Sequence, residues 1–267
     1  MKVLIIGGGN MGLTFAEGFL RSHLIDKENL HLLEKSDEQI KVLQSKGLVN
    51  VYKEIGSYIS EIDLIILAVK PQDCLHLLEK LADQIDEQQL VLSIMAGVSL
   101  ETLAEKLKTG KVIRSMPNLP AQVGSGMTVF TSSDEVTRVE LVTVQNLLNS
   151  TGKTIYVEVE DMIDAATAMS GSGPAYIFYF MKAMIAAGIE MGFSQAESEL
   201  LTSQTFKGAL NLYYASNYSC EQWIAKVSSK GGTTEAAFQS LLDNKVENLF
   251  QKAMYQAFDR ARALGGK

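Results

Sequence analysis

Residues 228–234, Ser-Ser-Lys-Gly-Gly-Thr-Thr, bring together groups suited to binding a small anion. The two glycines let the backbone turn its N–H groups toward one point, and serine and threonine commonly begin helices. A helical pattern follows over residues 235–242. Because the first turn of a helix has free N–H groups and a positive dipole end, the run predicts an anion site flanked by hydroxyls. A solvated loop with an ordinary helix cap has a similar composition, so that alternative stays open.

A second glycine-rich segment, residues 7–12, lies near the start of the chain and reads Gly-Gly-Gly-Asn-Met-Gly. Gly7, Gly9 and Gly12 fit the pattern G-x-G-x-x-G between an apolar run and a helical pattern. In dinucleotide-binding folds these glycines make a tight turn, admit the pyrophosphate and let helix and strand pack closely. We therefore expect Gly9, Asn10 and Met11 to hold a cofactor pyrophosphate. A glycine turn of another α/β protein is the alternative.

The residues after the second apolar run bear on the choice of cofactor. Glu34 lies about 20 residues beyond the glycines, where an acid accepts the ribose hydroxyls of NAD. Lys35 and Ser36 follow it and could instead hold the 2′-phosphate of NADP. The sequence therefore leaves NADH and NADPH both open, and Glu34 could also be a solvated charge.

The elements that would position these groups change character near residue 160. Before it, apolar strand-like runs alternate with helical patterns, which indicates a parallel sheet covered on both faces. The expected strands are residues 3–6, 30–33, 63–69, 90–95, 112–115, 127–130 and 154–159. After it, helical periodicity dominates. We therefore expect one domain over residues 1–159 and a helical domain over residues 160–267, in which a long apolar helix at 162–191 is buried, often against a second copy.

Composition narrows the chemistry and the partners. The chain has 267 residues and a formal net charge of −7 without basic runs, which argues against nucleic acid and anionic membranes as partners. No apolar stretch reaches the length of a membrane span. His23, His31 and His76 lie away from the small-residue motifs, and no metal-ligand spacing is visible, so neither a histidine triad nor a metal site is expected. The widely separated Cys74 and Cys220 favour a reducing cytoplasm.

Three further segments combine proline with small residues. Residues 68–72 and 116–120 each follow an apolar strand, at the carboxyl edge where open α/β sheets bind ligands. Residues 171–176, Gly-Ser-Gly-Pro-Ala-Tyr, interrupt the long apolar helix, where a Gly-Pro break would cost several kcal/mol without compensation.

The order of these motifs resembles the pyrroline-5-carboxylate reductases over nearly the whole chain. The matching segments are residues 7–12, 68–72, 116–128, 171–176 and 228–234, the last being the family signature. The resemblance implies a Rossmann-type doubly wound α/β domain followed by an all-α dimerisation domain, assembled as dimers or as decamers built from dimers. It also implies an NAD(P)H-dependent imine reductase that converts pyrroline-5-carboxylate to L-proline, the last step of proline biosynthesis.

Three positions depart from the family pattern. Leu119 stands where the family usually has threonine, Lys182 where it has glutamate, and Lys230 where it has proline. The hydroxyls and glycines of the signature remain, so the activity is still expected. The departures leave open a change in activity or substrate range.

The implied reaction suits what the chain has and lacks. An imine is readily protonated and is then an electrophile, so the protein mainly has to orient it and exclude water. We expect Thr234 to lie beside the ring nitrogen, with Ser229 also in a catalytic role. The carboxylate would be held by Ser229, Gly231, Gly232 and Thr233. On the cofactor side, the expected contacts are Ala68, Val69, Lys70, Pro71 and Asn118, with Lys70 as a less favoured catalytic acid.

The sequence leaves two other functions open. β-Hydroxyacid dehydrogenases share the layout but use a helix lysine with an asparagine four residues later, whereas Lys182 is followed at that spacing by Ala186. A paralogue that binds NADP as a regulator, without catalysis, is the other alternative, and the three departures are its support.

Overall fold

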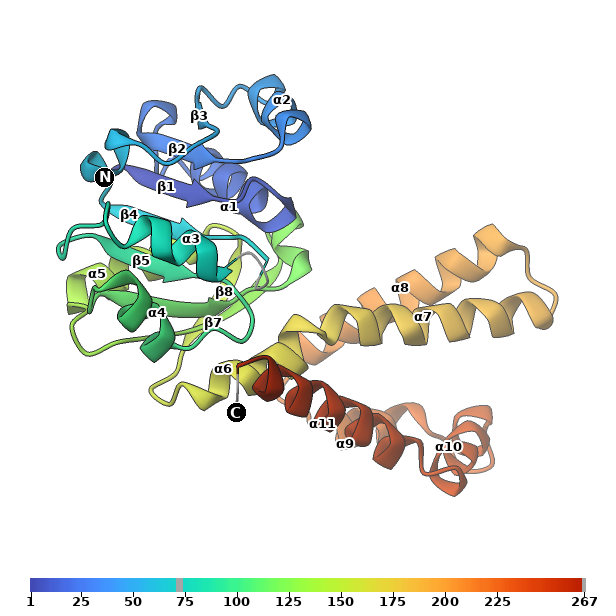
Figure 1. Ribbon diagram of the computed structural model, residues 1–267. Coiled ribbons are helices and arrows are strands. Elements are labelled where there is room, and N and C mark those ends of the chain that lie inside the picture. Colours follow the sequence, from blue (N-terminus) through green and yellow to red (C-terminus); the bar gives the residue numbers. More distant parts are fainter. Residues whose placement is uncertain (71–73, 266–267) are drawn as a thin grey trace. The chain divides into compact units, whose positions relative to one another are not determined.

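The computed structural model describes residues 1–70 and 74–265 (Figure 1). Contacts between Cα atoms divide the chain into two compact units, Met1–Ser172 with Ala257–Lys267, and Gly173–Gln256. The first unit contains the sheet and the second is helical. Each is described by itself.

The first unit is built on an eight-stranded sheet with the order β3-β2-β1-β4-β5-β6-β7-β8. Its first six strands have the order of a Rossmann fold, which confirms the expected doubly wound α/β class. The order reverses between β1 and β4, and this is where such sheets bind their ligands. The strands are β1 Val3–Ile6, β2 Leu30–Leu33, β3 Asn50–Tyr52, β4 Leu64–Leu67, β5 Leu90–Ser93, β6 Val112–Met116, β7 Gly126–Ser132 and β8 Gly152–Tyr156.

Alternate side chains of the central strands enter two separate cores. Val3 and Ile5 of β1 join one apolar cluster, and Leu4 and Ile6 join the other. The first cluster takes side chains from α1 (Asn10–Arg21) and α5 (Arg138–Asn149), and the second from α3 (Cys74–Leu81) and α4 (Leu100–Leu107). Because both faces are covered, the central strands β1 and β4 are apolar throughout.

One pairing differs from the expected parallel sheet. β6 and β7 pair antiparallel, with Ser115 opposite Phe130. A parallel pairing needs a crossover of a dozen or more residues, and the connector over residues 117–125 is too short for one. The sequence pattern therefore located the strand at 127–130 correctly, but the expected parallel direction was wrong.

A buried ion-pair network joins β6 to α6 (Asp161–Ala166). Arg114 Nη2 donates to Asp164 Oδ1 over 2.6 Å and Arg114 Nη1 to Glu160 Oε1 over 2.8 Å. The Arg114 and Asp164 side chains are only 2% and 3% exposed. Glu160 Oε1 also accepts from the N–H of Leu100 over 2.9 Å, so this carboxylate ties α4 to the same site.

His31 on β2 should make the free energy of unfolding depend on pH. Its ring is buried and stacks on Tyr52, with the Tyr52 hydroxyl 3.2 Å from Nδ1. Burial, with a smaller effect of the Lys2 charge, lowers the pKa of His31 below its ordinary value of 6.5. The unfolded chain therefore takes up a proton at a higher pH than the folded protein does. The free energy of unfolding should fall as the pH drops below about 6.5, by up to about 1.4 kcal/mol per pH unit.

Urea unfolding between pH 7.5 and 5 checks this expectation, with His31→Phe as the comparison. The variant should lose the part of the pH dependence that His31 causes. An identical slope in both proteins would show that another group is responsible.

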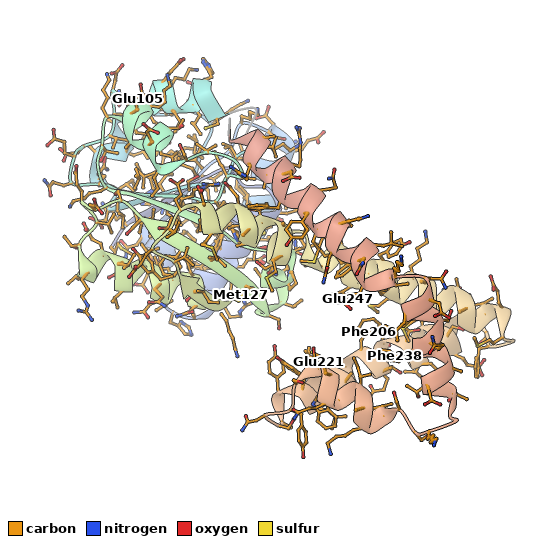
Figure 2. All side chains as sticks on the ribbon, turned by 90° about the horizontal axis from the view of Figure 1, so that it is seen from below. Glu105, Met127, Phe206, Glu221, Phe238 and Glu247 are labelled. Carbon is orange, nitrogen blue, oxygen red and sulfur yellow. The ribbon has the colours of Figure 1, made fainter. Side chains whose placement is uncertain are left out.

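The second unit contains α7 (Gly173–Glu190), α8 (Gln195–Tyr214), α9 (Cys220–Val227), α10 (Thr233–Asp243) and the first part of α11 (Val246–Leu264). α7 packs on α8 so closely that a Cβ on Gly188 would lie 2.8 Å from Ser198 Oγ. Phe250 of α11 packs edge-on against Tyr176 and Phe180. Phe206 on α8 and Phe238 on α10, both labelled in Figure 2, are half-buried.

The long helix expected over residues 162–191 is divided in two. A π-helical turn, Thr167–Gly171, separates α6 from α7, because the Gly-Pro pair at 173–174 begins a new helix instead of continuing the old one. None of the described side chains of α7 is fully buried in the single chain. Within residues 1–70 and 74–265, no helix has both the length and the apolarity that a membrane span requires.

Candidate functional site

The glycine-rich loop lies at the carboxyl end of β1, where the strand order reverses. A Cβ on Gly7 would lie 2.6 Å from the carbonyl oxygen of Ala68, and Gly7 has a φ of +102° that favours glycine. A Cβ on Gly12 would lie 1.9 Å from the carbonyl oxygen of Gly7. Gly9, by contrast, has open space around the position of a Cβ. The tight and open glycines therefore fit a dinucleotide, with Gly9 on the side that a pyrophosphate can approach.

Side chains from the segment after β2 and from α2 (Asp37–Ser45) hold this loop in place. Glu34 Oε2 accepts from the N–H of Gly8 over 2.8 Å, and Glu34 Oε1 accepts from the N–H of Ser36 over 2.8 Å. Gln39 Nε2 donates to the carbonyl oxygen of Gly8 over 2.5 Å. Ser36 is the N-cap of α2, and its hydroxyl accepts from the N–H of Gln39. Gln39 could not be recognised from the sequence, because one glutamine in a surface helix matches no motif.

The end of β4 lies beside the glycine loop. Ala68 donates its N–H to the carbonyl oxygen of Ile6 over 2.8 Å, and its own carbonyl faces Gly7. Val69 is half-buried against the second core cluster, and the Lys70 side chain is exposed. Ala68, Val69 and Lys70, three of the expected cofactor contacts, therefore directly follow β4, which pairs with β1 where the strand order reverses. Pro71 lies outside the described residues.

Asn118 has a role in the structure that the sequence did not reveal. Its Oδ1 accepts from the N–H of Met127 over 2.8 Å, and its Nδ2 donates to the carbonyl oxygen of Ser170 over 3.0 Å. The side chain thus ties the turn after β6 to the π-helical turn before α7. One hydrogen of Nδ2 is left for a cofactor contact, so the expected role of Asn118 stays a prediction.

The run at 228–234 forms the connection between α9 and α10 in the helical unit. Gly232, and not a serine or threonine, is the N-cap of α10, and no side chain caps the helix. Gly231 has a φ of +72°. A Cβ on Gly232 would lie 2.5 Å from Ser229 Oγ, so the glycine makes room for the Ser229 hydroxyl. Thr233 and Thr234 begin the helix, and their N–H groups have no acceptor within it.

The two glycine N–H groups of this connection are already bonded. Gly231 donates to Glu235 Oε2 over 2.7 Å, and Gly232 donates to the carbonyl oxygen of Ser229 over 2.9 Å. Ser228 Oγ is buried and has no hydrogen-bond partner among the described residues. At the start of α10, the N–H groups of Thr233 and Thr234, with the hydroxyls beside them, therefore stay available to bind an anion.

Two family models match this chain, one in the helical part and one in the part that contains the glycine-rich loop. Residues 160–264 match the family model for the pyrroline-5-carboxylate reductase dimerisation domain. Residues 2–97 match the model described as NADP oxidoreductase, coenzyme F420-dependent. The pyrroline-5-carboxylate reductase of Aquifex aeolicus is 34% identical over 99% of this chain and 97% of its own length. That of Corynebacterium melassecola is 32% identical, with 98% of each chain covered.

Solved structures agree along the whole chain. A pyrroline-5-carboxylate reductase from Coxiella burnetii has a TM-score of 0.89 and 31% identity, and 98% of each chain is covered. The Plasmodium falciparum pyrroline carboxylate reductase with NADP bound has a TM-score of 0.88 and 29% identity, over 99% of this chain and 98% of that one. The chain therefore belongs to the pyrroline-5-carboxylate reductase family.

Proposed function

We propose that this protein reduces the cyclic imine pyrroline-5-carboxylate to L-proline with NADH or NADPH. The observation that carries the proposal is the relationship to reductases of this name over nearly the whole chain. In the reaction a hydride adds to the imine carbon and a proton to the ring nitrogen, so the C=N bond becomes a single bond. The reduced nicotinamide, when bound, supplies the hydride.

The glycine-rich loop and the segments after β2 and β4 bind and orient the dinucleotide. Gly9, Asn10 and Met11 would hold the pyrophosphate at the N-terminus of α1, where backbone N–H groups and the helix dipole favour an anion. Glu34, Lys35 and Ser36 would face the adenosine ribose. Ala68, Val69 and Lys70, with Pro71 and Asn118, would line the nicotinamide side.

The connection before α10 binds the substrate. We assign the carboxylate to the N–H groups of Thr233 and Thr234 and to the Ser229 hydroxyl. Gly231 and Gly232 shape the turn that presents these groups, since their own N–H groups are bonded within it. The Thr234 hydroxyl orients the ring nitrogen and holds its proton. Lys230, at the tip of the connection, adds a positive charge that favours an anion.

Thr234 offers the direct test of this assignment. Replacing Thr234 by alanine should lower kcat about 5- to 150-fold, because one well-placed hydrogen bond contributes roughly 1–3 kcal/mol. The dissociation constant of the reduced cofactor should change little. Thr234→Ser keeps the hydroxyl and should retain most of the activity. Unchanged steady-state kinetics in Thr234→Ala would remove this residue from the mechanism.

Substrate comparison separates the proposal from the other two functions. Absorbance of NADH or NADPH should fall when pyrroline-5-carboxylate is added, and proline should appear by mass spectrometry. Oxidation only by keto forms of β-hydroxyacids would favour the dehydrogenase alternative. Bound cofactor that no substrate oxidises would favour a regulator.

The helical unit supports an oligomer. Phe178 and Tyr179 on α7 are 62% and 69% exposed in the single chain, and Leu200 on α8 is 68% exposed. Large apolar side chains exposed on neighbouring helices are typical of a surface that another protein covers. The family model also names this region for dimerisation. We propose a homodimer, or decamers built from dimers, with residues 1–159 binding cofactor and 160–267 carrying the interface. We also propose a cytoplasmic location, where Cys74 and Cys220 stay reduced.

A further inference from the structure

We propose that Glu34 makes this reductase prefer NADH to NADPH. The inference rests on the proposed function only in naming the cofactor of the same reaction. It concerns a choice that the sequence left open between an acid, Glu34, and two residues able to hold a phosphate, Lys35 and Ser36.

The position of the Glu34 carboxylate is fixed by the fold. Glu34 directly follows β2, and both of its oxygens accept backbone N–H groups, from Gly8 and from Ser36, each over 2.8 Å. One of these donors belongs to the glycine-rich loop itself. The carboxylate is therefore held next to the pyrophosphate loop, at the strand end where Rossmann folds receive the adenosine ribose.

A fixed carboxylate at this position distinguishes the two cofactors. Each oxygen retains lone pairs that can accept a ribose hydroxyl, as in NADH. A 2′-phosphate has no hydrogen to donate when ionised and brings nearly two negative charges. Because two backbone hydrogen bonds hold the carboxylate, it can turn away only by giving up its bonds to the N–H groups of Gly8 and Ser36.

The other charges near Glu34 also disfavour the 2′-phosphate of NADPH. Asp37 and Glu38 occupy the first turn of α2, where a phosphate would otherwise meet the helix N-terminus. Of the nearby cations, Lys53 forms an ion pair with Asp37 over 2.7 Å. The Ser36 hydroxyl caps α2 by accepting from Gln39. Asp37 and Glu38 thus add two negative charges close to Glu34 in the chain, and the charge of Lys53 is already paired, which disfavours a dianionic group here.

Direct binding measurements test the proposal without relying on turnover. The dissociation constants of NADH and NADPH are measured by fluorescence titration of the full chain without substrate. The natural protein should bind NADH at least 10-fold more tightly than NADPH. Glu34→Gln should narrow this ratio at least 5-fold, chiefly by tighter binding of NADPH. Glu34→Asp, which keeps the charge, should retain the preference even if both affinities fall.

Glu28→Gln is the matched control. It removes one carboxylate from the turn before β2, at the opposite end of that strand, and should leave the ratio unchanged. Equal or tighter binding of NADPH by the natural protein, or an unchanged ratio in Glu34→Gln, would overturn the proposal. The ratio is internal to each variant, so partial loss of folded protein does not affect it. Failure to reduce pyrroline-5-carboxylate would contradict the proposed function while these ratios still report on Glu34.

Discussion

Replacing Gly9 by valine should weaken binding of NADH and NADPH at least 100-fold while the free energy of unfolding stays within about 0.5 kcal/mol. Gly9 is the N-cap of α1 with a φ of −68°, which any residue can adopt. Among the described residues, a Cβ at this position meets no atom within 4 Å beyond those of Gly9 and its two chain neighbours. The new side chain would therefore start in open space, where we expect the pyrophosphate to bind. A 100-fold loss of affinity corresponds to about 2.8 kcal/mol.

Two further glycines make this test specific. Gly12→Ala should destabilise the protein as well as abolish cofactor binding, because its Cβ would collide with the carbonyl oxygen of Gly7. Gly56→Ala, where the nearest atom is Tyr58 Cε1 at an ordinary 3.4 Å, should change neither property. Cofactor titration and urea unfolding of the three variants give the comparison. Full cofactor affinity in Gly9→Val would show that the dinucleotide binds elsewhere.

Arg114→Leu should lower the free energy of unfolding by about 3–5 kcal/mol, the largest stability effect we expect from one polar residue. The substitution leaves the Asp164 carboxylate, only 3% exposed, without its partner. An unpaired buried charge is costly because the interior cannot replace its hydration. The loss should appear in urea unfolding at pH 7 as a lower midpoint with a similar slope.

The double variant Arg114→Leu/Asp164→Leu separates charge burial from lost packing. It should recover most of the stability, because apolar pairs of similar volume often replace buried ion pairs at little cost. Lys53→Met, which breaks the exposed pair with Asp37, is the control and should cost about 0–1 kcal/mol. A double variant as unstable as Arg114→Leu would mean that the shape of Arg114, and not its charge, is what matters.

The parts of the fold that could be predicted are those with a strong local signal. The apolar runs of β1 and β4 are buried on both faces, and such strands are recognisable because nothing polar interrupts them. The glycine spacing at 7–12 was also sufficient, since Gly7 and Gly12 are required by contacts that the structure displays. β3, with three half-buried residues, and α9, with no buried residue, have no comparable pattern.

What could not be predicted depends on contacts between distant residues. The antiparallel direction of β7 follows from the length of its connection to β6, not from its composition. Ser170, one partner of Asn118, and both carboxylate partners of Arg114 lie 46 to 52 residues away along the chain, beyond any local motif. At 228–234 the sequence indicated a turn followed by a helix, but neither that Gly232 is the N-cap nor that Glu235 accepts from the N–H of Gly231. The catalytic and binding roles given to these residues stay predictions.

Transfer of deuterium from the cofactor to the product tests the central claim most directly. The protein is incubated with pyrroline-5-carboxylate and with NADH or NADPH that carries deuterium at the transferring position of the nicotinamide ring. One cofactor should be oxidised for each proline formed. One deuterium should appear in proline at the former imine carbon, on the far side of the nitrogen from the carbon that bears the carboxylate. Bound cofactor with no labelled proline, under conditions where a known reductase of this family gives it, would contradict the account.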